Sequence, residues 1–151
     1  MKVLILGYSN IVRKRVLRVF KENNLKIYVA SKTHKKKISG IDGQFNSYLN
    51  ALKKSKPSLV YISLPNSEHF IWAKKSLNYK FNTIVDKPIT LNVKQLEELI
   101  KLSRKNKKLL VESTFFNYHI QVKKLIKEFR DARYKKIYAK FIIPKPDKKA
   151  F

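Results

Sequence analysis

The sequence has no cysteine, only three glycines and only ten acidic residues among its 151 positions. Without cysteine, neither a disulfide framework nor a thiolate metal site can form, and we expect no metal centre. Long hydrophobic runs are missing too. The apolar run at residues 3–6 is too short for the core of a signal peptide, and nothing approaches a membrane span. We therefore expect a cytoplasmic protein with a packed hydrophobic core.

Acidic residues are scarce beside basic ones. The 35 Lys and Arg against 10 Asp and Glu give a formal net charge of +25. Such an excess attracts polyanions, so a nucleic-acid binder is one hypothesis. The basic residues are spread along the whole chain, however, and no helix-turn-helix, zinc-finger or RNA-recognition signature gathers them. We favour a lysine-rich surface over a nucleic-acid site.

Short apolar runs alternate with amphipathic stretches along the chain. Strands are predicted at residues 3–6, 27–30, 59–62, 83–85 and 109–111. Helices are predicted at residues 12–20, 48–54, 70–77, 93–100 and 122–129, the third with Asn66 or Ser67 as N-cap. Residues 32–47 are expected to be loop with at most a short strand. This alternation specifies βαβ units, and therefore an α/β fold with a doubly wound parallel sheet.

The last segment breaks this rhythm. Apolar residues alternate with period two over residues 136–143, and Pro144 ends the pattern, which is typical of an antiparallel strand with one buried face. The strand has no partner in the sequence. We expect it to be the first strand of a second α+β domain, with a first domain at residues 1–118 and the rest at 119–151. It is also a candidate edge for self-association.

Residues 7–12, GYSNIV, stand where a dinucleotide-binding chain carries G-x-G-x-x-G, and only Gly7 of the three glycines is present. Ser9 could donate a hydrogen bond to a phosphate oxygen, whereas Val12 should push the following helix slightly off the sheet. The helix N-terminus still offers free N–H groups to an anion. A phosphate loop and a plain turn are both compatible with these residues.

Two further strand ends carry candidate groups. The second strand ends at Ser31-Lys32, where a ribose-binding carboxylate is expected; a hydroxyl and a cation suit the 2′-phosphate of NADP better. Lys87, restrained by Pro88, projects from another strand end and could hydrogen-bond a substrate hydroxyl during hydride transfer. Taken alone, both could be solvated surface loops.

Four segments together carry a family resemblance. KVLILGYSNIVRKR, VYISLPNSEHFIWAKKSL, VDKPIT and LLVESTFFNYH resemble, in order and spacing, the motifs of the glucose–fructose oxidoreductase and inositol dehydrogenase family, Gfo/Idh/MocA. VDKPIT is similar to its E-K-P motif, with Asp86 in place of the glutamate. The resemblance covers residues 1 to about 143 and implies a Rossmann-like NAD(P)-binding domain.

The resemblance also implies a set of site residues. The cofactor-binding residues would be Gly7, Tyr8, Ser9, Asn10, Ile11, Ser31, Lys32, Leu64, Pro65, Asn66, His69, Asp86 and Lys87. Of these, Leu64, Pro65, Asn66 and His69 would line the nicotinamide side. Lys87 would be the catalytic residue that contacts both substrate and cofactor, and its bond to Pro88 is expected to be cis.

The implied function is that of the cofactor-binding domain of an NAD(P)-dependent oxidoreductase acting on a sugar, nucleotide-sugar or polyol. NADP is favoured over NAD. The family's second domain, with an Asp and a His that complete the catalytic group, would lie beyond Phe151, so we expect the chain to be inactive alone. His119 stands at the position of a family histidine but is expected to cap or pack. The alternative is a non-catalytic module used for self-association or partner binding.

Overall fold

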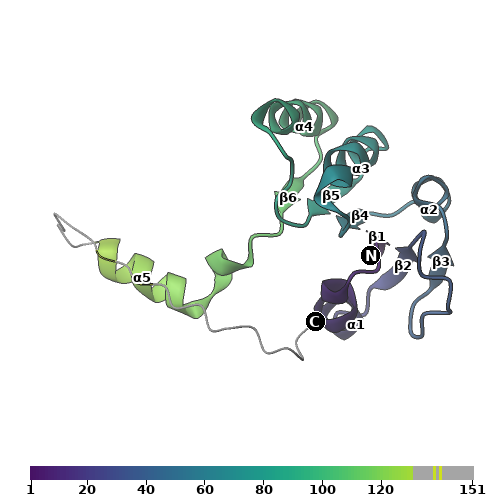
Figure 1. Cartoon of the computed structure of the whole chain (residues 1–151), viewed down its shortest axis with the longest axis horizontal. Helices are drawn as coiled ribbons and strands as arrows, with labels where there is room; N and C mark the ends of the chain where they lie inside the picture. Colours follow the sequence, from purple (N-terminus) through teal and green to yellow (C-terminus); the bar gives the residue numbers. More distant parts are fainter. Residues whose placement is uncertain (131–137, 139, 141–151) are drawn as a thin grey trace. The chain divides into compact units, whose positions relative to one another are not determined.

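The computed structural model describes residues 1–130, 138 and 140. Its chain divides into two compact units after Thr114, and each unit is described by itself (Figure 1). The strand predicted at residues 136–143 lies outside the described residues, apart from two single positions. Among the helices that the structure does describe, none has both the length and the apolar composition needed to span a bilayer.

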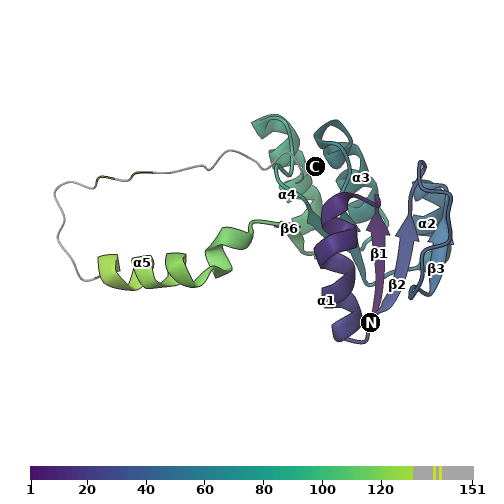
Figure 2. The ribbon, with the colours of Figure 1, turned by 60° about the horizontal axis from the view of Figure 1, so that its bottom comes forward.

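Residues 1–114 form a six-stranded parallel sheet, which confirms the predicted doubly wound α/β fold (Figures 1 and 2). Its strands are β1 (Lys2–Leu6), β2 (Lys26–Ala30), β3 (Gly43–Phe45), β4 (Leu59–Ile62), β5 (Asn82–Val85) and β6 (Leu110–Glu112). They lie in the order β3-β2-β1-β4-β5-β6. The chain winds outward from β1 in one direction and returns to β4 on its other side, so the switch point lies between β1 and β4.

Side chains of each buried strand alternate between two cores. Leu4 and Leu6 of β1 pack with α2 (Tyr48–Ser55), α3 (Asn66–Asn78) and α4 (Val93–Asn106). Val3 and Ile5 face the opposite layer, where α1 (Leu17–Glu22) lies (Figure 2). Burial on both faces explains why β1 reads as a continuous apolar run instead of an alternating one.

Two helix starts show how local sequence fixes the elements. Ser47 and Asn92 cap α2 and α4, each accepting a hydrogen bond from the backbone N–H three residues later. The expected cap of α3 is wrong: neither Asn66 nor Ser67 caps it. Pro65 occupies the N-cap position, with φ −56° and ψ 143°, and Asn66 is the first helical residue. The fixed φ of proline suits the entry to a helix, but its side chain accepts no hydrogen bond.

Val12 lies in the first turn of the helix that follows β1, and its side chain is fully buried against the sheet. The segment Val12–Val16 is a π-helical turn, η1, closed by the N–H of Leu17 on the carbonyl of Val12. A π turn is wider than an α turn. It therefore makes room for a valine at the place where a glycine would allow closer contact between helix and strand.

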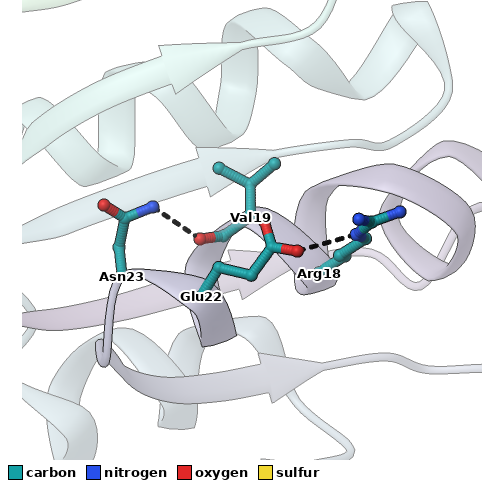
Figure 3. Close-up of polar contacts among 4 residues, drawn as sticks. All are labelled: Arg18, Val19, Glu22 and Asn23. Carbon is teal, nitrogen blue, oxygen red and sulfur yellow. Dashed lines mark hydrogen bonds and ion pairs between the residues drawn. The ribbon is translucent and has the colours of Figure 1, made fainter.

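The far end of α1 is held by short-range polar contacts (Figure 3). Arg18 Nε lies 2.8 Å from Glu22 Oε1, and Asn23 Nδ2 donates to the carbonyl of Val19 at 2.9 Å. Both members of the ion pair are largely exposed, so the pair contributes little stability. The side chain of Asn23 closes the last turn of the helix just before the chain enters β2.

The second unit contains the 3₁₀ turn η2 (Phe115–Tyr118) and the helix α5 (Ile120–Arg130). His119 accepts a hydrogen bond through Nδ1 from the backbone N–H of Gln121 at 3.3 Å. It therefore caps the start of α5, which confirms the role expected for it.

Candidate functional site

A cavity of about 540 Å³ opens at the carboxyl ends of the central strands. Every predicted site residue except Asn10 lines it. The loop after β1 contributes Gly7, Tyr8, Ser9 and Ile11, and the end of β2 contributes Ser31 and Lys32. Leu64, Pro65, Asn66 and His69 follow β4, while Asp86 and Lys87 follow β5. Asn10 is exposed, and its Oδ1 accepts a hydrogen bond from Arg13.

Gly7 brings the first loop against the end of β4. Its φ is +99°, a conformation that side chains other than glycine rarely adopt. A Cβ at this position would lie 2.0 Å from the carbonyl oxygen of Ser63. The one glycine that the loop keeps is therefore the one that this close approach requires.

Ser9 stands in place of the second glycine, and its hydroxyl is engaged inside the protein. Ser9 Oγ accepts a hydrogen bond from the backbone N–H of Val12 at 3.2 Å and lies 2.8 Å from Ser63 Oγ. Ser63 Oγ donates in turn to Asp86 Oδ2 at 2.5 Å. Since Ser63 gives its only hydrogen to the carboxylate, Ser9 must donate to Ser63. In this conformation the Ser9 hydroxyl has no hydrogen left for a phosphate.

Asp86 is held from the other side by Tyr61, whose hydroxyl donates to Oδ1 at 2.5 Å. Burial raises the pKa of Tyr61, and the adjacent carboxylate of Asp86 raises it further, so the phenol remains a donor. Both carboxylate oxygens are therefore occupied by protein donors. Asp86 anchors the strand end from which the exposed Lys87 enters the cavity lining.

His69 joins the loops that follow β4 and β5. Its ring is fully buried, with Nδ1 2.7 Å from the carbonyl oxygen of Pro88 and Nε2 2.8 Å from that of Leu64. The Lys87–Pro88 bond is cis, as the family resemblance implied. Because both ring nitrogens face backbone carbonyls, His69 acts in this structure as a brace between the two loops.

Ser31 and Lys32 play different parts at the end of β2. The Ser31 side chain is buried, and its Oγ accepts a hydrogen bond from the N–H of His34 at 3.1 Å, which closes the loop. Lys32 is exposed. Its Nζ lies 4.8 Å from the ring centroid of Tyr48 and 3.8 Å from a carboxylate oxygen of Glu68. The ammonium group of Lys32 therefore lies close to both the ring of Tyr48 and the carboxylate of Glu68.

A basic groove of about 890 Å³ adjoins the cavity at Lys32. Lys35, Lys37 and Lys54 also line it. Gln44 shapes its wall, since the side-chain amide accepts from the N–H of Ile38 at 3.0 Å and donates to the carbonyl of Lys36 at 2.9 Å. Lysines that are scattered in the sequence are therefore gathered next to the end of β2, where they create a local positive potential.

Sequence reasoning missed four residues that shape this site: Tyr48, Tyr61, Ser63 and Glu68. Three of them line the cavity, and Tyr61 reaches it through Asp86. In the part of the chain that the structure describes, no cluster of three or more His, Asp or Glu side chains could hold a metal ion. The chemistry open to the site is recognition of an anionic ligand by backbone N–H groups and lysines.

Comparison with known proteins bears on the ligand. Residues 1–114 match the family model GFO_IDH_MocA, described as "Oxidoreductase family, NAD-binding Rossmann fold". The uncharacterized oxidoreductase YgjR of Escherichia coli (strain K12) is 37% identical over 54 residues, which cover 36% of the chain and 16% of YgjR.

Two solved structures share the fold. One is KijD10, a 3-ketoreductase from Actinomadura kijaniata, in complex with TDP-benzene and NADP; it is 23% identical, with a TM-score of 0.79 over 86% of the chain and 43% of KijD10. The other is a D-galactose-1-dehydrogenase from Rhizobium etli, 20% identical, with a TM-score of 0.78 over 86% of the chain and 42% of the dehydrogenase. The chain thus spans less than half the length of either.

Proposed function

Since the chain belongs to the Gfo/Idh/MocA oxidoreductase family, whose NAD-binding Rossmann domain matches residues 1–114, we propose that its cavity holds a nicotinamide dinucleotide for hydride transfer to or from a sugar, nucleotide-sugar or polyol. One observation carries the proposal. Residues from four strand ends, separated by up to 80 positions in the sequence between Gly7 and Lys87, line the same cavity. In open α/β sheets this crevice is where ligands bind.

The pyrophosphate would lie on the loop after β1. The backbone N–H groups of Tyr8 and Ser9 precede the helix and make no hydrogen bond among the described residues. The helix start beyond them adds the partial positive charge of its dipole. Because the Ser9 hydroxyl donates to Ser63, backbone groups and not this side chain would hold the phosphate oxygens.

Lys87 would hold the oxygen of the reacting carbinol or carbonyl carbon. It is exposed at the cavity, and Asp86 beside it is fixed by two hydrogen bonds, so the lysine extends from a rigid base. A bound nicotinamide would accept or supply the hydride. The named activities of KijD10 and the D-galactose-1-dehydrogenase favour a sugar-like substrate. The chain covers less than half the length of these proteins, and the residues named here account for the cofactor side of the site.

NADP is the preferred cofactor in this proposal. The end of β2 carries Lys32 and no carboxylate of its own, and the basic groove with Lys35, Lys37 and Lys54 adjoins it. A 2′-phosphate placed there would meet positive potential from several lysines. NADP is also the dinucleotide in the KijD10 complex.

Titration with NADPH tests the proposal. Trp72 is the single tryptophan of the chain and its ring centroid lies 5.9 Å from Lys32 Nζ, so its emission should report occupancy. We expect micromolar binding that Lys32→Ala weakens by up to about fivefold, the value of one exposed charge contact of about 1 kcal/mol. Lys26→Ala, which removes the same charge from the opposite end of β2, is the matched control and should change little. Equal losses in both variants would point to non-specific attraction.

The alternative is a non-catalytic module that uses the same fold for self-association or partner binding. It predicts no dinucleotide binding even at millimolar cofactor. A nucleic-acid binder using the basic groove would instead show an affinity for DNA or RNA that falls steeply with salt. The same chain, titrated with cofactor and with an oligonucleotide at two salt concentrations, separates the three functions.

A further inference from the structure

The ammonium group of Lys32 already lies beside a carboxylate and two aromatic rings. Its Nζ lies 3.8 Å from Glu68 Oε2, 4.8 Å from the centroid of the Tyr48 ring and 5.9 Å from that of Trp72. Glu68 and Tyr48 both line the cavity, as Lys32 does. The adenosine end of the cavity therefore contains a carboxylate, although the residues that end β2 supply none.

The position of this carboxylate does not depend on Lys32. Trp72, one helical turn further along α3, donates from Nε1 to Glu68 Oε2 at 2.9 Å. Glu68 also lies in the first turn of α3, where the helix dipole favours a negative charge. Its side chain is about one-third exposed, which leaves it open to a ligand in the cavity. Glu68 is thus pre-oriented by the helix and by an indole.

Tyr48 is equally fixed. The side chain of Tyr48 is buried, and this burial raises the pKa of its phenol. Tyr48 and Trp72 meet edge to face, with ring centroids 5.0 Å apart. The aromatic pair joins the start of α2 to α3, and Lys32 and Glu68 lie beside it in the lining of the same cavity.

We propose that Glu68 determines the choice between the two nicotinamide dinucleotides, by opposing a 2′-phosphate and offering an acceptor to a 2′-hydroxyl. This inference rests on the proposed function. Lys32 attracts the dianionic phosphate of NADP, and Glu68, 3.8 Å from the ammonium, cancels much of that attraction. A free ribose hydroxyl can instead donate to the carboxylate. The chain should therefore accept NAD alongside NADP, with only a modest preference for NADP.

Glu68→Gln tests the inference with little disturbance to the fold. Glutamine keeps the volume and an oxygen for the Trp72 donor while removing the charge. Glu98→Gln is the matched control, because it breaks an exposed ion pair with Lys74 on the helices behind the site, at a glutamate that does not line the cavity. The measurement is the dissociation constant of NAD⁺ and of NADP⁺ for each protein by calorimetry.

Glu68→Gln should raise the ratio of the NAD⁺ constant to the NADP⁺ constant by about tenfold, whereas Glu98→Gln should leave the ratio within about twofold of the wild type. The double variant Glu68→Gln with Lys32→Ala should lose most of that gain. An unchanged ratio in Glu68→Gln, with both dinucleotides still bound, would overturn this inference alone. If the wild-type chain binds neither dinucleotide, the proposed function fails and this inference with it.

Discussion

Replacing Gly7 by alanine should damage the end of β4 as well as the loop itself. Gly7 has a φ of +99°, and the new Cβ would lie 2.0 Å from the backbone oxygen of Ser63. Real Cβ contacts are essentially never shorter than 3.0 Å, so the backbone at Ser63 must shift by about 1 Å. The contact is with a backbone carbonyl at the end of a buried strand, which cannot swing away as a side-chain tip does.

The cost follows from what the shift disturbs. A non-glycine residue at this φ carries about 1–3 kcal/mol of strain. Moving Ser63 also weakens its N–H bond to the carbonyl of Leu6, 2.8 Å, and its hydroxyl bond to Asp86. With about 1 kcal/mol for the first bond and about 1.5–3 kcal/mol for the second added to the strain, the free energy of unfolding should fall by about 3.5–7 kcal/mol. A domain of this size is stable by only about 5–15 kcal/mol.

Gly40→Ala is the matched control. Gly40 also has a positive φ, +71°, but its Cβ would meet Lys21 Nζ at 2.5 Å, the tip of a flexible side chain. Only the backbone strain, about 1–2 kcal/mol, should therefore be lost. Urea unfolding followed by circular dichroism measures both variants. If Gly7→Ala and Gly40→Ala lose the same stability, the close approach to Ser63 is not what holds the loop.

Three further substitutions test the stability contributions of other polar contacts. The folded-state pKa of Tyr61 lies above its unfolded value of 10.0, so the stability tied to its phenol is complete below pH 10 and is lost as the pH rises. Tyr61→Phe should abolish that loss, at most about 1.4 kcal/mol per pH unit, in urea unfolding between pH 8 and 11; parallel curves for the two proteins would refute it. His69→Leu removes the ring N–H that donates to one of the two backbone carbonyls, of Leu64 or Pro88, and should cost about 1–3 kcal/mol by thermal unfolding; a loss below about 0.5 kcal/mol would argue against the brace. Asn92→Ala removes the cap of α4, in which Asn92 Oδ1 accepts a hydrogen bond from the N–H of Gln95 at 3.0 Å, and should cost about 1 kcal/mol. Asn78→Ala, at the last residue of α3, is the neutral control.

The sequence indicated the sheet and the cavity because both depend on signals that are local in the chain. A run such as residues 3–6 is apolar at every position since both faces of its strand are buried, and the alternation with helices then specifies a parallel sheet. Parallel strands present their carboxyl ends at one edge. Residues that follow those runs, such as Gly7, Lys32 and Lys87, were therefore expected at one site, and they line one cavity.

The network around Asp86 could not be predicted in this way, because it depends on register between strands. Ile62 of β4 pairs with Val85 of β5, so Ser63 and Asp86, the next residues, leave the sheet side by side. These two residues are 23 positions apart in the sequence. Nothing in either segment alone shows which serine would meet the carboxylate. The same holds for Ser9: a role as a phosphate donor was expected for it, whereas its hydroxyl bonds to Ser63, the residue that follows β4.

Glu68 escaped prediction for a different reason. A ribose-binding acid is expected at the end of β2, whereas the carboxylate beside Lys32 comes from α3, which follows β4. A local signal was present: Glu68 and Trp72 stand four residues apart, the spacing at which helical side chains meet. It indicates a fixed carboxylate, but only the fold shows that this carboxylate lies beside Lys32.

The most direct test of the account is a titration of the ¹⁵N-labelled chain with NADP⁺, followed by backbone amide NMR. We predict saturable chemical-shift changes concentrated at the amides of Tyr8, Ser9, Lys32 and Asn66, which line the cavity. Inorganic triphosphate, which carries negative charge without a nucleoside, should move the loop after β1 and leave Asn66 in place. Shifts spread over the lysine-rich surface, or no shifts at saturating NADP⁺, would contradict the claim that this cavity is a dinucleotide site.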